Sequence, residues 1–290
     1  MRSLSRKAAG TLFLLPALAV LGGVLVFPLL FSLGLSFSKL NMLEGRPPQF
    51  VGLANYIQVL GDAGTWNSLW VTFIFVIATL ACELAFGTLL ALFIYSFPPR
   101  MRFVRTFLLI PMMVAEVVTA LSWRFLLDPD FGIINHVVVS LGGSAQAWTN
   151  AQWALVSIIA VDIWHNTSFV TLILLAGLQS IPHEFLESAK VDGAAYVRRV
   201  RHIILPLVNP QLVIALLFRL IFSMRVFTTP WVLTGGGPAD RTLVYGIDIY
   251  RTAFRYYEMG TAASLSWILV VVSMIITVLY LRLFSREGMR

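Results

Sequence analysis

Ionisable and amide side chains lie in the middle of several long apolar stretches of this chain, where they are costly unless they serve a purpose. Asp162 and His165 are three residues apart, so a helix places them on one face. With Asn166 and Arg219 they offer hydrogen-bond donors and acceptors to a hydroxyl-bearing ligand, and nearby aromatic rings offer it a flat apolar surface. The candidate set comprises Glu116, Asp162, Trp164, His165, Asn166, Arg219 and Phe227.

The same side chains have a structural alternative. Asp162 or Glu116 would neutralise Arg219, and His165 would hydrogen-bond a neighbouring helix to hold a bundle together. Arg219 and Arg225 are six residues apart, about 120° from a shared helical face, so we do not expect them to form one anion clamp. The residue types alone leave the ligand-binding and the structural interpretation both open.

The elements that position these side chains are predicted to be membrane-spanning helices. Of the 290 residues, 58% are hydrophobic and 12% are charged, with a mean hydropathy of +0.84, whereas soluble domains are about 25% charged. Six stretches reach the roughly 20 apolar residues that cross a bilayer. They are about 11–38, 68–96, 103–127, 153–178, 203–227 and 262–281. We therefore expect an all-α bundle of six transmembrane helices, with residues 1–290 forming a single domain.

Positive charge predicts the orientation of these spans, because segments rich in Lys and Arg stay in the cytoplasm. With the N-terminus inside, the inner segments hold thirteen of the 21 Lys and Arg residues and the outer segments hold five. Both termini are therefore expected in the cytoplasm. The inner set is Arg2, Arg6, Lys7, Arg100, Arg102, Arg105, Lys190, Arg198, Arg199, Arg201, Arg282, Arg286 and Arg290. The net charge is +7, but the basic residues are spread over four inner segments and do not gather on one face, so we predict no nucleic-acid binding.

Several functional classes lack their motifs. The sequence contains no His-Glu-x-x-His or Gly-x-Ser-x-Gly, so no enzyme activity, catalytic residue or metal site is predicted. Ala17-Leu18-Ala19 resembles a signal-peptide cleavage site, but the first apolar stretch exceeds the usual 7–15 residues, so we expect no cleavage. An ion-coupled secondary transporter that uses Asp162 and Glu116 as proton or cation sites remains the rival from another class.

A polar segment at 179–206 interrupts the apolar pattern on the predicted inner side. We expect a short helix from about Pro182 to Val191, because Pro suits a first helical position. Gly193 supplies the backbone freedom to end it, and Asp192 is expected to cap a second helix through Ala194 to Ile204. Pro206 and Pro210 should kink the inner end of the fifth span. The structural alternative is an amphipathic interfacial helix whose Arg198, Arg199 and Arg201 touch anionic lipid.

The segment Glu187-Ser188-Ala189-Lys190-Val191-Asp192-Gly193-Ala194, followed by Ile203-Ile204-Leu205-Pro206, resembles the EAA loop of binding-protein-dependent ABC importer permeases. In that family the loop docks on a cytoplasmic ATPase. The resemblance implies a coupling set of Glu187, Ser188, Ala189, Asp192, Gly193, Ala194, Val200 and Pro206. Ser188 stands where Ala is usual, and Val200 stands where an aromatic residue is usual.

Other segments resemble the first permease subunit of maltose-type carbohydrate importers. The range 50–56 is similar to the segment after the first span, and 233–238 is similar to an outer-loop signature whose residues are Gly235, Gly236, Gly237 and Pro238. Thr228 departs from the family, where Asp commonly follows Phe227. With these segments, the resemblance covers about 10–285.

The resemblance implies a multi-pass permease of the bacterial inner membrane that imports an oligosaccharide, disaccharide or related polyol by alternating access. Its partners would be a second, homologous permease, two ATPase subunits, an extracytoplasmic solute-binding protein and membrane lipid. This chain has no Gly-x-x-x-x-Gly-Lys-Ser/Thr for ATP phosphates, so ATP and Mg would lie on the ATPase subunits and no cofactor would bind here. Glycerol-3-phosphate or another glycerol derivative is the alternative substrate.

Overall fold

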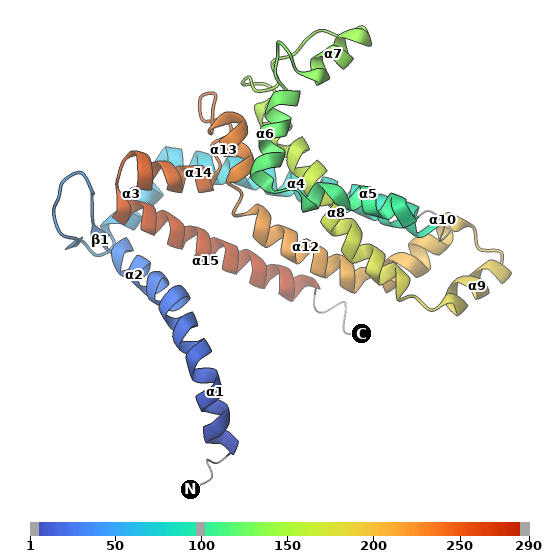
Figure 1. Ribbon diagram of the computed structural model, residues 1–290, viewed down its shortest axis with the longest axis horizontal. Coiled ribbons are helices and arrows are strands. Elements are labelled where there is room, and N and C mark those ends of the chain that lie inside the picture. Colours follow the sequence, from blue (N-terminus) through green and yellow to red (C-terminus); the bar gives the residue numbers. More distant parts are fainter. Residues whose placement is uncertain (1–5, 97–101, 285–290) are drawn as a thin grey trace. The chain divides into compact units, whose positions relative to one another are not determined.

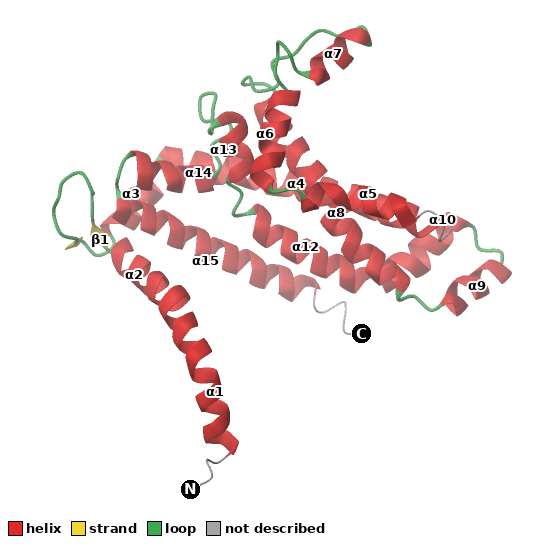
Figure 2. Cartoon of the chain, in the orientation of Figure 1, coloured by secondary structure: helices red, strands yellow, loops and turns green. Residues whose placement is uncertain are grey.

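The computed structural model describes residues 6–96 and 102–284, and helices make up most of this part of the chain (Figures 1 and 2). Arg2, Arg100, Arg286 and Arg290, which entered the orientation argument, lie outside the described residues. The chain divides into two compact units. Unit 1 comprises Met1–Thr65 with Ile249–Val271, and unit 2 comprises Trp66–Asp248 with Val272–Arg290.

Unit 1 contains an apolar helical segment followed by a two-stranded sheet and a short helix, α3, that hydrogen bonds tie to the end of that segment. Its elements are α1 (Arg6–Leu21), η1 (Gly22–Val26, π-helical), α2 (Phe27–Ser36), β1 (Ser38–Lys39), β2 (Gln49–Phe50), α3 (Ala54–Gly61), η4 (Arg251–Arg255, π-helical) and the first half of α15 (Met259–Phe284). The strands pair antiparallel, with Ser38 opposite Phe50. The buried amide of Asn55 donates to the carbonyls of Ser36 and Ser38 at 2.9 and 3.0 Å, which holds α3 against the end of α2.

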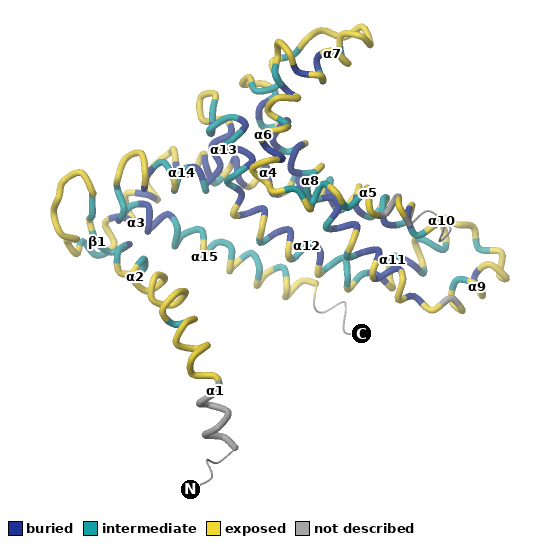
Figure 3. The backbone as a smooth tube through the Cα atoms, in the orientation of Figure 1, coloured by how far each residue is buried: buried dark blue, intermediate teal, exposed yellow. Residues whose placement is uncertain are grey.

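The apolar segment Leu14–Ser36 of unit 1 is exposed along nearly all of its length (Figure 3). Most of its large side chains are more than half exposed, among them Leu30 and Phe31. A soluble chain would hide such a helix in its core, whereas a helix that crosses lipid needs no such cover. The exposure therefore fits a helix that is solvated by hydrocarbon.

Unit 2 holds the packed helices that position the site. Its elements are α4 (Ala63–Ser96), α5 (Arg102–Met113), α6 (Glu116–Leu126), α7 (Ile133–Ser140), α8 (Ala154–Gln179), α9 (His183–Val191), α10 (Tyr196–Arg199), η3 (Val200–Ile204, π-helical), α11 (Leu205–Leu207), α12 (Asn209–Ser223), α13 (Thr228–Thr234) and α14 (Tyr245–Tyr250). The central helix is α8, which packs against α5, α6, α12 and α13 (Figure 1).

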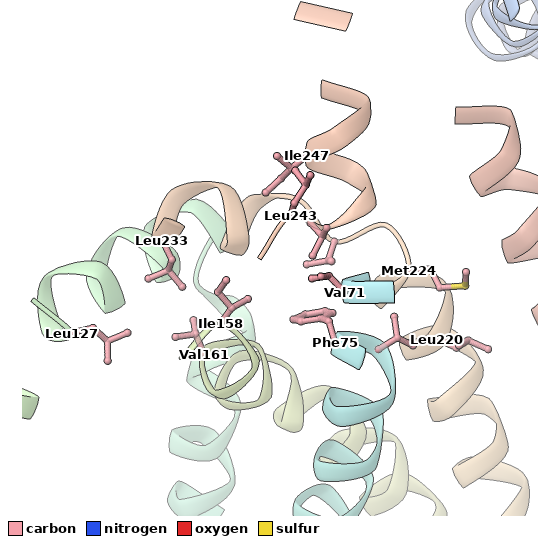
Figure 4. Close-up of a cluster of buried hydrophobic side chains, with 13 residues drawn as sticks. Val71, Phe75, Leu127, Ile158, Val161, Leu220, Met224, Leu233, Leu243 and Ile247 are labelled. Carbon is pink, nitrogen blue, oxygen red and sulfur yellow. The ribbon is translucent and has the colours of Figure 1, made fainter. Parts of the chain in front are cut away.

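The hydrophobic core of unit 2 forms where helical faces with three- and four-residue spacing meet. Figure 4 shows side chains from α4, α8 and α12 in one cluster. Its labelled members are Val71, Phe75, Leu127, Ile158, Val161, Leu220, Met224, Leu233, Leu243 and Ile247. A polar contact joins α4 to the start of α14, since the buried Thr72 hydroxyl accepts the Tyr245 N–H at 2.8 Å. The core thus fixes α4, α8 and α12 beside one another.

The described residues include four straight helices that are long and apolar enough to span a membrane. They are Leu14–Ser36, Ala63–Tyr95, Ala154–Gln179 and Met259–Phe284, and they match four of the six predicted stretches. The third predicted span is not a straight helix, because Thr106–Met113 and Glu116–Leu126 meet at 100°. Pro111 lacks an N–H, and Ala115 is extended (φ −60°, ψ 136°), so the helical ladder stops there.

The fifth predicted span also bends. Tyr196–Leu207 and Asn209–Ser223 meet at 65°, with the break at Val208 between Pro206 and Pro210. This confirms the predicted kink. The second half ends at Ser223 and not at 227 as predicted, and Phe227 leads into the separate helix α13.

Candidate functional site

Arg219 is the centre of a buried ion triad in unit 2. Its Nε and Nη2 donate to the two carboxylate oxygens of Glu83, both at 2.6 Å, and Nη2 also donates to Oδ2 of Asp162 at 2.7 Å. The side chains of Glu83, Arg219 and Asp162 are 0%, 5% and 8% exposed. Because the three residues belong to α4, α12 and α8, the triad ties three helices together.

The triad supports part of the structural interpretation, in which a carboxylate neutralises Arg219. The predicted pairing of Asp162 with Arg219 is confirmed, whereas Glu116 is not a partner of Arg219. The partner that accepts through both carboxylate oxygens is Glu83, which is not among the predicted pathway residues. Glu83 is the one charged residue within the predicted span 68–96, and a lone charge in a span is the signal that marks it.

A cavity of about 350 Å³ opens beside the triad. Helix α8 contributes polar groups to its wall, and the segment that follows α12 contributes both charged and aromatic groups. The lining residues are Met112, Glu116, Asp162, His165, Asn166, Phe169, Arg219, Phe222, Ser223, Arg225, Val226, Phe227 and Thr228. Six of the seven predicted pathway residues therefore line one cavity: Glu116, Asp162, His165, Asn166, Arg219 and Phe227.

Trp164 is the predicted pathway residue that lies elsewhere. It lines a separate apolar groove with residues of α4 and α5, and its ring stands edge-on to Trp123 at 5.5 Å between centroids. Successive helical residues are about 100° apart, so Trp164 is turned by about 160° from Asp162, which points to the cavity. Phe169 and Phe222 line the cavity instead.

Hydrogen bonds orient the polar lining. The Asn166 amide donates to Oδ1 of Asp162 at 3.0 Å, and His165 Nδ1 lies 3.3 Å from the Thr119 hydroxyl on α6. The Thr229 hydroxyl donates to Glu116 at 3.3 Å. These bonds leave carboxylate, amide and imidazole groups at the wall, a mixture that can both donate to and accept from hydroxyl groups.

The predicted separation of Arg225 from Arg219 is wrong. Helical spacing puts Arg225 about 120° from Arg219 only where one helix continues through 227, but α12 ends at Ser223, so this separation does not hold. Both residues line the same cavity, and Arg225 is exposed. Among the residues that the structure describes, no carboxylate lies within 4.0 Å of Arg225. The cavity therefore contains one cation that the triad does not neutralise.

The polar loop after α8 forms the predicted sharp bend. Gly193 has φ +72°, and the N–H groups of Asp192, Gly193 and Ala194 donate to the carbonyls of Ser188, Lys190 and Ala189 at 2.9–3.0 Å, which closes the end of α9. The predicted cap is wrong, because the next helix begins at Tyr196 with Ala195, not Asp192, at its cap. The extended backbone of Ala195 (ψ 154°) carries the chain past Asp192 before the helix starts.

The predicted coupling residues differ in exposure. Glu187, Ser188, Asp192 and Pro206 are exposed, and Ala194 and Val200 are half-buried. Ala189 is buried, at 7% exposed. A partner would therefore meet Glu187 and Ser188 on α9 before it met Ala189.

The glycine run after α13 forms a turn, as the sequence predicts. Gly235 and Gly236 have φ +61° and +91°, which ends α13, and the peptide before Pro238 is cis. The Thr242 hydroxyl donates to the Gly237 carbonyl at 2.7 Å and closes the turn. Thr228 follows Phe227 at the start of α13 and lines the cavity.

Long apolar helices, together with a polar cavity beside a buried ion triad in unit 2, are typical of a multi-pass membrane protein. Residues 83–287 match the family described as the binding-protein-dependent transport system inner membrane component, and the chain belongs to this family. It is therefore an inner-membrane component of such a transport system. Members of this family are transport permeases rather than enzymes.

Relatives match the chain along almost its whole length. It is 33% identical to the sulfoquinovosyl glycerol transport system permease protein SmoG of Agrobacterium fabrum, over 98% of this chain and 92% of that protein. It is 33% identical to the trehalose/maltose transport system permease protein MalF of Thermococcus litoralis, over 96% and 95%. The sn-glycerol-3-phosphate transport system permease protein UgpA of Yersinia pestis is 32% identical, over 95% and 94%.

A solved structure shares the fold. It is the crystal structure of a bacterial ABC transporter involved in the import of the acidic polysaccharide alginate, with a TM-score of 0.85 and 22% identity, over 98% of this chain and 97% of that one. At this identity the match is evidence for the fold alone.

Proposed function

We propose that this chain is the transmembrane permease subunit of an ATP-driven importer of an oligosaccharide, disaccharide or related polyol. The observation that carries the proposal is the cavity beside Arg219, which combines hydroxyl-binding groups with aromatic walls. Two relatives that match nearly the whole chain are named for trehalose/maltose and for a glycosyl glycerol, which supports a carbohydrate. The substrate would pass between the polar wall of α8 and the aromatic rings of Phe169 and Phe227.

A phosphorylated glycerol derivative is the second candidate substrate. Arg225 supports it, because this exposed guanidinium lines the cavity without an acidic partner among the described residues. A relative named for sn-glycerol-3-phosphate is 32% identical, against 33% for the two relatives named for a sugar. Glu116, which lines the same cavity, opposes an anion and favours a neutral polyol.

The proposed topology has six spans in one permease domain of residues 1–290, with both termini in the cytoplasm. Each bent helix pair then counts as one span, in accord with the four straight and two broken apolar helices of the described residues. Irregular backbone within a membrane is tolerated where it lines a cavity. The break before Glu116 meets that condition, because Glu116 lines the cavity beside Arg219.

The proposed coupling element is the loop Glu187–Ala194, which would be held by a separate ATPase that binds ATP and Mg. Closure of two ATPase subunits would move α9 and reorient the spans, so that the cavity faces outward to a solute-binding protein and then inward. A second permease of the same family would complete the pathway. Glu187 and Ser188 are exposed and available for such a contact.

The test is Gly193→Val, with Gly142→Val as its matched control. Both glycines have a left-handed backbone, with φ +72° and +87°, and a Cβ at either position meets no atom within 4 Å. Any effect therefore comes from backbone strain of about 1–2 kcal/mol and from location. Only Gly193 lies in the coupling loop.

Uptake of labelled trehalose, maltose and glycerol-3-phosphate would be measured in cells that express the whole transport system. We expect ATP-dependent, ionophore-resistant uptake of one of these probes or of another sugar from a wider panel. Gly193→Val should abolish uptake while insertion stays normal, and Gly142→Val should leave it unchanged. Wild-type uptake by Gly193→Val would refute the coupling role, and uptake by this chain alone under an ion gradient would establish the secondary-transporter rival.

A further inference from the structure

Glu83 is a charged residue that lies behind the wall of the cavity beside Arg219. Its side chain is fully buried on α4 and does not line the cavity, whereas Arg219 and Asp162 do. A buried carboxylate is costly unless charged partners and hydrogen bonds offset its lost hydration. Any effect of Glu83 on a solute in the cavity must pass through Arg219.

The hydrogen bonds of Arg219 within the described residues occupy two of its three guanidinium nitrogens. A guanidinium has five N–H donors, one on Nε and two on each Nη nitrogen. Nε and Nη2 donate to Glu83, and Nη2 also donates to Asp162, so neither of these nitrogens has a donor left. In the part of the chain that the structure describes, Nη1 has no acceptor. Because Arg219 lines the cavity, the N–H groups of Nη1 are the donors that it can offer there.

Close packing fixes the position of Glu83 on α4. Thr79 and Gly87 lie one helical turn before and after it, on the same helical face. Thr79 is fully buried, and a Cβ at Gly87 would meet Cγ1 of Val170 on α8 at 2.7 Å. Because α4 approaches α8 this closely, the carboxylate of Glu83 has a fixed place. Its contact through both oxygens then fixes the plane of the guanidinium as well as its position.

The charges of the triad favour an uncharged solute group at Nη1. Both oxygens of Glu83 accept hydrogen bonds from Arg219, as an ionised carboxylate does. With Asp162, two carboxylates face one guanidinium, so negative charge is in excess. A carboxylate or phosphate at Nη1 would be repelled by both carboxylates. A hydroxyl would not be repelled, and it can accept from Nη1 while it donates to Asp162.

We propose that Glu83 is a positioning residue for the solute, which holds Arg219 so that Nη1 donates to an uncharged oxygen of the transported carbohydrate. This role rests on the proposed function and specifies which part of the solute the site recognises, namely a hydroxyl. It differs from the role of the triad in holding α4, α8 and α12 together. Holding the helices needs the charge of Glu83, whereas positioning also needs its carboxylate at the right distance from the guanidinium.

The experiment compares Glu83→Gln and Glu83→Asp with Thr79→Val in the purified complex of both permeases and the ATPase subunits. Glu83→Gln keeps the length of the side chain but loses one acceptor oxygen and the charge. Glu83→Asp keeps the charge but withdraws the carboxylate by one methylene group. Thr79→Val is the matched control, because it removes a buried hydroxyl from the same face of α4 whose hydrogen bond goes to the Phe75 carbonyl.

The measurement is the equilibrium binding of labelled trehalose, maltose and glycerol-3-phosphate without the solute-binding protein, so that the Kd belongs to the membrane site. Both Glu83 variants should raise the Kd of the bound sugar about 10- to 100-fold, the equivalent of one hydrogen bond from a charged donor. Thr79→Val should stay within about twofold of the wild type. Adding Glu83→Gln to Arg219→Met should not weaken binding further, since Nη1 is already absent. Melting temperatures of the same samples separate a loss of binding from a loss of folded complex.

Several results would overturn this role. Wild-type Kd values in both Glu83 variants would show that the position of the guanidinium does not matter to the solute. A wild-type Kd in Glu83→Asp alone would show that only the charge matters. Tighter binding of glycerol-3-phosphate than of either sugar would overturn the choice of an uncharged oxygen. Sugar uptake by the wild type together with unchanged Kd values refutes only the role of Glu83, whereas neither binding nor uptake of any sugar by the wild type refutes the proposed function as well.

Discussion

Replacing Arg219 with Met tests the ion triad that holds α4, α8 and α12. The substitution removes three charged hydrogen bonds of 2.6–2.7 Å and leaves the carboxylates of Glu83 and Asp162 without their cation. Glu83 is fully buried, and among the described residues no other Lys or Arg nitrogen lies within 4.0 Å of it, whereas Asp162 keeps the Asn166 amide. The stranded charge at Glu83 should therefore dominate the loss of stability.

The magnitude follows from that burial. Breaking a buried ion pair by removing one partner costs about 3–5 kcal/mol. Glu83→Gln leaves Arg219 paired with Asp162 and should cost less, about 1–3 kcal/mol, because an amide still accepts a hydrogen bond. The double variant Glu83→Gln/Arg219→Met contains no stranded charge at 83. It should be more stable than Arg219→Met alone.

The assay is the melting temperature of the purified complex, followed by size-exclusion chromatography after heating. At roughly 2–4 °C per kcal/mol, Arg219→Met should lower it by about 6–20 °C. Arg225→Met is the matched control, since it lines the same cavity but has no carboxylate within 4.0 Å in the described part of the chain. We expect its melting temperature to stay within about 2 °C of the wild type.

Two results would refute this reasoning. Equal melting temperatures for Arg219→Met and Arg225→Met would mean that the triad does not hold the helices. A double variant less stable than Arg219→Met would mean that the carboxylate of Glu83 is not stranded by loss of the guanidinium.

Two further predictions concern close packing and the outer loop. Gly260→Ala should reduce the yield of folded protein, because the added Cβ would overlap the Ser38 carbonyl. Gly61→Ala, which meets nothing within 4 Å, should be neutral or slightly stabilising in detergent melts. Asn135→Leu removes four hydrogen bonds, to Pro129, Gln146 and Trp148. We expect this loss to destabilise the loop between α6 and α8 by about 2–4 kcal/mol, so that limited proteolysis cleaves the loop faster. Ser140→Ala, an exposed position in the same loop, should cleave at the wild-type rate, and protection of Asn135→Leu would contradict the role of Asn135.

Local features of the fold were predictable from the sequence. The length of apolar stretches located the straight helices, and Gly193 located the bend because few other residues adopt its backbone. Prolines 206 and 210 located the kink in the fifth stretch. The break in the third stretch was not predicted, because apolar residues continue across it. Its available signals were Pro111 and the charge of Glu116 within an apolar stretch.

Contacts between helices were not predictable in the same way. Glu83 and Arg219 are separated by 136 residues, and only the packing of α4 on α12 decides that they meet. Trp164 is a different case, because helical spacing alone turns it about 160° from Asp162, so its absence from the cavity wall could have been predicted. The separation of Arg219 from Arg225 failed because helical spacing applies only while the helix lasts, and α12 ends between them.

The 100° turn between α5 and α6 has a consequence for biogenesis. With 12 and 11 residues, the two arms measure about 18 and 16 Å, and neither reaches across about 30 Å of hydrocarbon. During synthesis each arm emerges without the neighbours that later cover its ends, since α5 packs on α8 and α6 packs on α13. Stable insertion of this segment therefore waits for two helices that the ribosome has not yet made, and truncation before α8 should leave it accessible to labelling from the aqueous side.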